Sequence, residues 1–282
     1  MTTIEFDGLI FDDAATSGLT ISKLTGWWDG PGVRLNLNDR PQAHGSFGVA
    51  KAWRTARTVT VEGTCVGLSM ADTYAMIDRL AALQASGMPG VFRVNEPFGS
   101  KQIVANLALA PQMPDQLFSP FFTFSFAVTS PDSFKYGLPA AISTGVPVAA
   151  GGLIYPLGSG SAYWDYGTGG ASGRIALTNI GTAPVFPPFE VTGGLDGVVV
   201  TDVTTNQVVR LDRQIPAGST AFFNQRTGRA YLDNVSSDIS PFISSRGWFQ
   251  IGPGETHQIQ FQPLGAVVGS PTLTVRMSPA YL

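Results

Sequence analysis

Apolar and polar residues alternate with a period of two along most of this chain. In the first half the alternation covers four stretches, at 19–21, 33–37, 57–62 and 122–128. Because successive side chains of a strand point to opposite faces, each stretch is expected to be a strand with one buried face. The last stretch carries three phenylalanines on that face. The first half is therefore predicted to be a β domain.

The period changes once, at Ser69. Ser69 followed by Asp72 resembles a capping box, and Gly87 is a suitable stop signal. Between them runs an apolar stripe at helical spacing, made of Met70, Tyr74, Ile77 and Ala81 and widened by Leu80 and Leu83. The sequence thus predicts a single α-helix over 69–86, packed on a sheet because its polar side is narrow.

The composition changes after residue 136, where a stretch up to Gly173 is rich in Gly, Ala, Pro and Ser. Beyond Arg174 only strand patterns recur, at 175–177, 189–191, 198–200, 257–261 and 273–277. Short strands at near-regular spacing without a helix are typical of a β-sandwich. We expect two domains, residues 1–136 and 137–282.

Charge and cysteine content narrow the class of protein. The net charge is −3 and no run of Lys or Arg exceeds a pair, so a nucleic-acid-binding surface is not expected. Cys65, the single cysteine, has the parity of Val59 and Val61 and is expected in the core. The acidic start and the lack of a long apolar run argue against a signal peptide and a membrane anchor, so we expect synthesis in a cytoplasm.

A search for catalytic groups finds no phosphate-binding loop, nucleophile elbow or zinc-protease motif. The two histidines, His44 and His257, are far apart, and His257 is expected to be a satisfied strand-end residue. Asp12 and Asp13 would point to opposite faces of a strand, so a solvated turn is favoured over a carboxylate pair. We therefore predict no catalytic residue, no metal site and no cofactor.

Two aromatic groups are candidate contact residues. Tyr163, Trp164 and Tyr166 surround Asp165 in a glycine-rich setting, where exposed rings could stack on a sugar. Burial in the sandwich or at a subunit contact is the alternative interpretation. The same two interpretations apply to Trp27 and Trp28.

Several segments, in the same order, resemble the distal tail (Dit) and minor tail proteins of long-tailed, non-contractile (siphovirus-type) bacteriophages. They are the strand and helix of 54–83, the ending of the first half at 124–136 with its acidic, proline-containing junction, the opening of the second half at 179–193, and the closing stretch 248–261. At the junction Pro131 precedes Asp132, whereas the family often has the reverse order. The resemblance covers most of the chain.

This resemblance implies an N-terminal split-barrel or sandwich domain that forms a closed ring, usually of six copies, and a galectin-like, carbohydrate-binding-module-like C-terminal sandwich. Such a ring would sit at the tail tip of the virion and leave a channel through which DNA passes without specific binding. Its implied partners are the tail tube protein and the tail-associated baseplate protein, with the tape measure protein as a further candidate. Synthesis would take place in the host bacterium.

Glycan binding is the alternative to the structural role at the tail tip. The second half could be an adhesin module that binds a host glycan through Tyr163, Trp164 or Tyr166. A cell-wall hydrolase is the least supported reading, because nothing pairs a nucleophile with a base.

Overall fold

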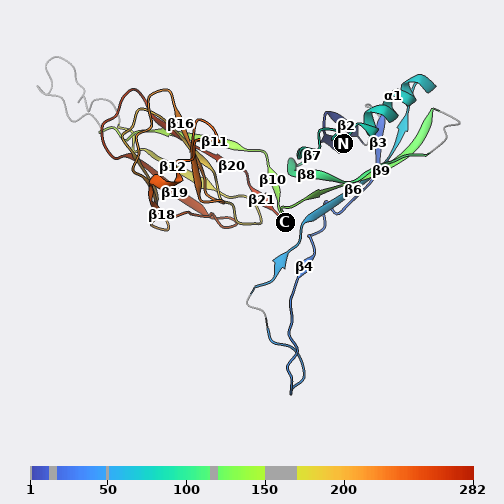
Figure 1. Ribbon diagram of the computed structural model, residues 1–282, viewed down its shortest axis with the longest axis horizontal. Helices are drawn as coiled ribbons and strands as arrows, with labels where there is room; N and C mark the ends of the chain where they lie inside the picture. The colour runs from blue at the N-terminus through green and yellow to red at the C-terminus, as the bar shows by residue number, and fades with distance from the viewer. Residues whose placement is uncertain (1, 13–17, 49–50, 115–119, 150–169) are drawn as a thin grey trace, which may run out of the picture. The chain divides into compact units, whose positions relative to one another are not determined.

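The computed structural model describes residues 2–12, 18–48, 51–114, 120–149 and 170–282 (Figure 1). The chain divides into two units, Met1–Leu138 with Tyr281–Leu282, and Pro139–Ala280. Each unit is described separately below. Both consist mainly of β-strands, as the alternation predicts.

The first unit is built on a sheet that closes on itself. Its strands follow the order β8-β7-β1-β2-β3-β6-β9, and β9 returns to pair with β8, which closes a seven-stranded barrel. The strands are β1 (Thr3–Phe6), β2 (Leu9–Asp12), β3 (Leu19–Thr25), β6 (Arg57–Val66), β7 (Gly90–Glu96), β8 (Gly99–Gln112) and β9 (Phe121–Ser130). Two short strands, β10 (Lys135–Gly137) and β21 (Ala280–Tyr281), extend the sheet beyond β8.

The barrel core consists of the inward residues of the alternating strands. Along β6 and β9, Val61 pairs with Phe126 and Cys65 pairs with Phe122, all buried. Burial raises the pKa of the Cys65 thiol, as expected for a core cysteine. Phe126 also lies 5.4 Å from Phe11, ring centre to ring centre. The predicted aromatic face of 122–128 is therefore confirmed.

The predicted helix exists, but it is shorter than expected. It is α1 (Met70–Ala81), capped by Ser69, whose Oγ accepts a hydrogen bond from Asp72 N. The prediction of a helix up to residue 86 is wrong because Gln84 takes a left-handed φ of +54°. Its side chain instead bonds to backbone groups of Ala105 and Leu107 on β8.

The buried side of α1 also differs from the predicted stripe. Thr73 and Leu80 are buried, whereas Met70 and Tyr74 are 37% and 54% exposed. The true stripe continues through Leu83 into the barrel core. The helix is thus rotated relative to the expected face, which leaves the side chains of Met70 and Tyr74 exposed.

An arm leaves the barrel between β3 and β6. It carries a two-stranded ladder, β4 (Val33–Arg34) and β5 (Trp53–Arg54), visible in Figure 1 as a long hairpin. The alternation at 33–37 was expected to bury one face. That expectation is wrong, because Val33, Leu35 and Leu37 are each about half exposed and no described part of the first unit covers them.

The second unit contains two five-stranded antiparallel sheets whose apolar faces are buried (Figure 1). The first sheet has the order β11 (Ala140–Gly145), β20 (Thr272–Met277), β13 (Phe189–Thr192), β16 (Thr220–Asn224) and β17 (Arg229–Leu232). The second has the order β12 (Arg174–Thr178), β19 (Thr256–Pro263), β14 (Val198–Asp202), β15 (Gln207–Leu211) and β18 (Ile243–Arg246). Only a 3-10 turn, η1 (Ser240–Phe242), interrupts the strands among its described residues. This confirms the prediction that the chain beyond Arg174 consists of strands without an α-helix.

Candidate assembly surface

The arm is exposed along nearly all of its described length. Every residue from Gly32 to Gly45 is exposed, and so are the described residues 51–56 on its returning limb. Backbone hydrogen bonds across the hairpin include Thr55 N to Gly32 O at 2.8 Å and Phe47 N to Asn38 O at 2.9 Å. Apolar side chains displayed at this density usually mark a surface for another protein. They are Val33, Leu35, Leu37, Phe47 and Trp53, between 49% and 57% exposed.

Two buried cations hold the base of the arm. Arg57 on β6 donates from Nη1 to the carbonyl oxygens of Gly26 at 3.0 Å, Trp27 at 3.2 Å and Asp29 at 2.8 Å. Lys135 on β10 donates from Nζ to the same Trp27 oxygen at 2.8 Å. The loop from which the arm departs is therefore tied to two strands of the sheet. We call these contacts the arm clamp.

The clamp places positive charge where solvent is excluded. Burial lowers the pKa of Arg57, and nearby Asp29 opposes this effect. Burial, followed by repulsion from Arg57 and Lys101, lowers the pKa of Lys135 to about 8. Within the described part of the chain, Arg57 Nη2 is buried without a hydrogen-bond partner. Burying these charged groups lowers the free energy of unfolding. Their hydrogen bonds in turn fix the position of the loop at the base of the arm.

The candidate aromatic residues fall into three situations. Trp27 is 1% exposed and packs 5.8 Å from Phe92 in the barrel core, so its ring cannot present itself to a glycan. Trp28 is 60% exposed and donates from Nε1 to Glu96 Oε1 at 2.8 Å. Tyr163, Trp164 and Tyr166 lie outside the described residues, and their role stays a prediction.

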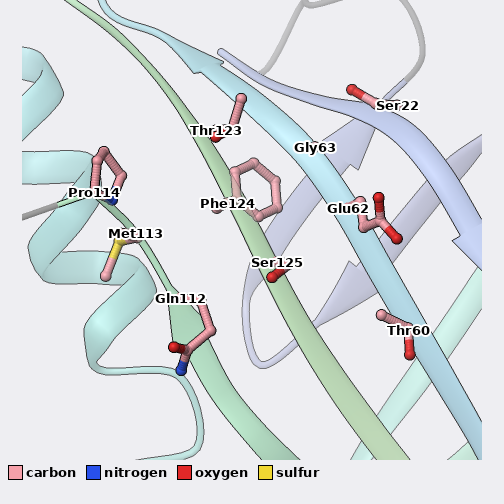
Figure 2. A pocket seen from close by; sticks show the side chains of 10 residues that line it. All are labelled: Ser22, Thr60, Glu62, Gly63, Gln112, Met113, Pro114, Thr123, Phe124 and Ser125. Atoms are coloured by element: carbon pink, nitrogen blue, oxygen red, sulfur yellow. The ribbon is translucent and has the colours of Figure 1, made fainter.

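A polar hollow of about 540 Å³ lies on the barrel wall, where Figure 2 shows its lining side chains. Its carboxylate, Glu62, lies 3.6 Å from Lys23 Nζ. The other lining residues are Ser22, Thr60, Gly63, Gln112, Met113, Pro114, Thr123, Phe124 and Ser125. The hollow offers hydrogen-bonding groups to a docking partner.

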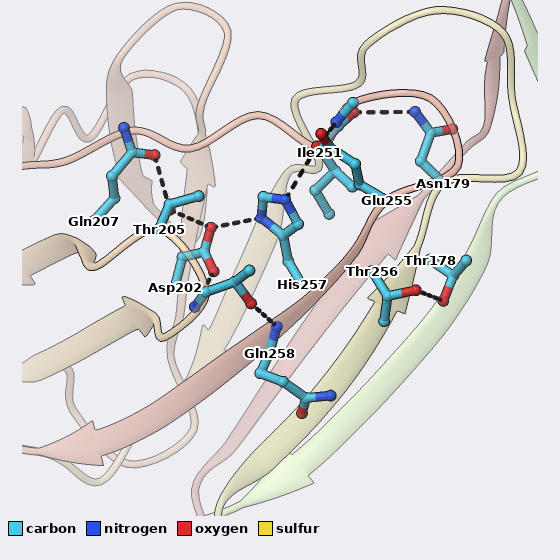
Figure 3. Close-up of polar contacts among 12 residues, drawn as sticks. Thr178, Asn179, Asp202, Thr205, Gln207, Ile251, Glu255, Thr256, His257 and Gln258 are labelled. Carbon is cyan, nitrogen blue, oxygen red and sulfur yellow. Dashed lines mark hydrogen bonds and ion pairs between the residues drawn. The ribbon is translucent and has the colours of Figure 1, made fainter.

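In the second unit, a network around His257 joins the end of β14 to the start of β19 (Figure 3). His257 Nδ1 lies 2.6 Å from Asp202 Oδ2, which also accepts a 2.6 Å bond from Thr205 Oγ1. His257 Nε2 lies 3.3 Å from Glu255 Oε2. Since Asp202 and His257 are buried, the network braces the sheet and offers no access to a substrate. The expectation of a satisfied strand-end histidine is confirmed.

Sequence reasoning missed the buried Arg57 and the buried partner of His257. Arg57 had a signal, because it has the inward parity of Val59 and Val61. The contact of Asp202 with His257 had none, since 55 residues separate the two. Asp12, expected in a solvated turn, is instead buried on β2, and Asp13 lies outside the described residues.

The described residues contain no group of His, Cys, Asp and Glu side chains arranged to hold a metal ion. Nor does any helix among them reach the length and apolarity needed to cross a membrane.

No family model and no curated protein matches this sequence. Solved structures do match. The Dit protein of phage SPP1, described as a paradigm of the hub adsorption apparatus of phages infecting Gram-positive bacteria, is 14% identical with a TM-score of 0.64, over 99% of both chains. A chain of the phage P2 baseplate, in its activated conformation with calcium, is 10% identical with a TM-score of 0.54, over 98% of both chains.

A third match is a chain of the phage p2 baseplate in its activated conformation with strontium, 10% identical with a TM-score of 0.50, over 98% of this chain and 97% of that one. At these identities the likeness concerns the fold, and it extends through both units. From end to end, this chain therefore has the fold of a phage distal tail (Dit) hub protein, as the order of its sequence segments predicts.

Proposed function

We propose that this chain is a structural subunit of a phage tail tip, in which several copies form a closed ring. The observation that carries this proposal is the likeness to the SPP1 Dit protein over 99% of both chains. A fold match alone does not assign function, so the proposal also needs a surface suited to assembly. The exposed arm is that surface.

The arm suits contact between identical copies. Its apolar side chains need a cover, and the barrel wall carries an exposed apolar patch made of Val66, Leu68 and Phe121. Val66 and Phe121 are paired neighbours at the end of the β6–β9 ladder. If the arm of each copy lies on this patch of the next, two different surfaces meet at every contact. Such heterologous contacts generate a ring when the rotation closes.

The two parts of the chain then have different tasks. Residues 1–136 form the ring, with six copies as the expected number, and residues 137–282 form a galectin-like sandwich outside it. The ring joins the tail tube protein to the tail-associated baseplate protein, with the tape measure protein as a further candidate partner. DNA passes through the channel without specific binding, which the net charge of −3 favours because a basic wall would retain DNA. The proposal needs no catalytic residue.

The ring is tested by mass in solution and by negative-stain microscopy of the purified full chain, alone and with tail tube protein. The combined variant Val33→Ser, Leu35→Ser, Leu37→Ser should remain folded, since these side chains are about half exposed, and should lose the ring. Leu68→Ser, at a side chain that is 99% exposed, should weaken the ring from the other side of the contact.

A matched control removes exposed apolar groups elsewhere. Val203→Ser, Val267→Ser and Val268→Ser, between 41% and 63% exposed in the second unit, should leave the ring intact. A wild-type chain that stays monomeric at high concentration and in the presence of tail tube protein would contradict the proposal. A ring formed by the arm variant would contradict the role of the arm.

A second candidate function, binding of a host glycan by residues 137–282, is favoured by one specific observation. An aromatic pocket opens on the solvent side of the β11-β20-β13-β16-β17 sheet. A glycan-binding assay on the full chain tests this function. Loss of binding in Trp164→Ala would assign it to the segment around Tyr163 and Tyr166, and retained binding would remove that segment from the site.

A further inference from the structure

The outward side of the β11-β20-β13-β16-β17 sheet carries an ordered row of side chains. Strand pairing places Tyr231 opposite Phe222, Phe222 opposite Glu190, and Glu190 opposite Thr274. Thr274 in turn faces Ser143, and their hydroxyls are 2.8 Å apart. Aromatic rings thus occupy one end of the row, a carboxylate the middle, and hydroxyls the other end.

The aromatic end of this row is hollowed. A pocket of about 320 Å³ lies over Phe222 and Tyr231, with Pro188 and Val235 among its apolar lining residues. Phe222 is 40% exposed although it lies in the middle of a strand. This volume lies at the lower end of the range of small-ligand sites. We call this feature the Phe222 pocket.

The polar lining of the pocket is held in place before any ligand arrives. Arg276 donates to Glu190 Oε1 from Nε at 3.1 Å and from Nη2 at 2.7 Å. Asn224 Oδ1 accepts from the backbone of Arg226 at 3.1 Å and of Thr227 at 3.2 Å, which orients its amide nitrogen.

We infer that the Phe222 pocket binds a neutral saccharide, with a pyranose ring on Phe222 and Tyr231 and its hydroxyls on Glu190, Arg276 and Asn224. A pyranose has a face of C–H groups that packs on an aromatic ring, and an edge of hydroxyls that both donate and accept hydrogen bonds. The pocket offers both kinds of surface side by side. The inference rests on the glycan-binding candidate function above and does not require the ring.

The charges favour a neutral ligand. Glu190 and Arg276 neutralise each other through their paired bonds, so the pocket has no uncompensated charge to attract a phosphate or an ammonium group. Breaking this pair to bind an ion would expose one partner without compensation.

The area of the pocket argues against a protein partner. Stable protein interfaces bury about 800 Å² on each side. On the pocket walls the exposed large apolar side chains are Phe222 and Val235, one in the floor and one on a rim loop. A patch of this size suits one or two sugar rings.

The test is isothermal titration calorimetry of the full chain with lactose, cellotetraose and chitotetraose, supported by saturation-transfer NMR to identify the sugar protons that touch aromatic rings. Wild type should bind at least one probe, with transfer concentrated on one face of a sugar ring. Phe222→Ser should raise the Kd about tenfold or more, which corresponds to about 1.4 kcal/mol. Phe222→Tyr should restore binding, and Glu190→Gln should weaken it with Phe222 in place.

Phe186→Ser is the matched control, because Phe186 is 38% exposed in the same unit and does not line the pocket. It should leave the Kd unchanged. The mass of each variant in solution distinguishes a failure of the saccharide site from a failure of the ring, because Phe222→Ser should lose saccharide binding and keep the ring. Absence of binding to all three probes at millimolar concentration, or equal binding by Phe222→Ser and wild type, would overturn the inference.

Discussion

Replacing Gly26 by alanine should destabilise the first unit strongly and release the arm from its fixed position. Gly26 has a φ of +82°, a conformation that costs an L-residue about 1 kcal/mol. A Cβ at this position would also lie 2.2 Å from the carbonyl oxygen of Thr58. Thr58 belongs to β6, which pairs with β9 on the far side, so this oxygen cannot retreat without disturbing the ladder.

The backbone strain and the steric overlap both lower the free energy of unfolding, and their sum can be given to an order of magnitude. Overpacking against a fixed neighbour costs roughly 1–3 kcal/mol, so with the backbone term we expect a loss of about 3 kcal/mol in the free energy of unfolding. Gly8 provides the control. It has a similar φ of +76°, but nothing lies within 4 Å of its added Cβ. Gly8→Ala should therefore cost about 1 kcal/mol.

The assay is urea denaturation of both variants, followed by tryptophan fluorescence, to which Trp27, buried beside the clamp, contributes. Ring formation is measured in parallel, since the Gly26 carbonyl accepts a bond from Arg57 in the clamp. Gly26→Ala should lose both stability and ring, while Gly8→Ala keeps the ring. Equal destabilisation by the two substitutions would refute the steric reasoning.

Three further outcomes follow from buried or half-buried polar groups. Because its folded pKa is lowered to about 8, Lys135 binds a proton more weakly in the folded state, so the stability of wild type should rise between pH 8 and pH 10.5 relative to Lys135→Met. Urea titrations should show a difference of up to about 2 kcal/mol after solvent screening, and no difference would contradict the buried charge. Asp202→Ala leaves His257 buried without its 2.6 Å partner and should cost about 3 kcal/mol in thermal unfolding of the second unit. Gln84→Ala should cost about 1–2 kcal/mol by removing its bonds to β8, and it should speed hydrogen exchange at Leu107 N. Unchanged exchange there would count against that contact.

The arm shows why alternation alone does not predict burial. Leu35 and Leu37 have the same parity pattern as Val59 and Val61, yet the first pair is about half exposed and the second pair is fully buried. A period of two says that side chains share a face, and it does not say whether another surface covers that face. For 57–66 the cover comes from within the barrel. For 33–37 nothing described in the first unit supplies it.

Local sequence patterns are enough to predict the elements that depend on neighbours in the chain. The strand at 122–128, the capped start of the helix and the inward position of Cys65 follow from local periodicity and capping, which act over a few residues. The order of these segments was also enough to indicate the Dit fold.

The tertiary structure decided everything that joins distant segments. The end of α1 depends on Gln84 reaching β8, 23 residues away at Leu107, and the arm clamp joins Lys135 to Trp27 across 108 residues. The Phe222 pocket exists because strand register sets Phe222 beside Glu190. Register and closure are chosen by the packing of the whole core, which no local pattern contains, so these sites become visible only when the chain is folded.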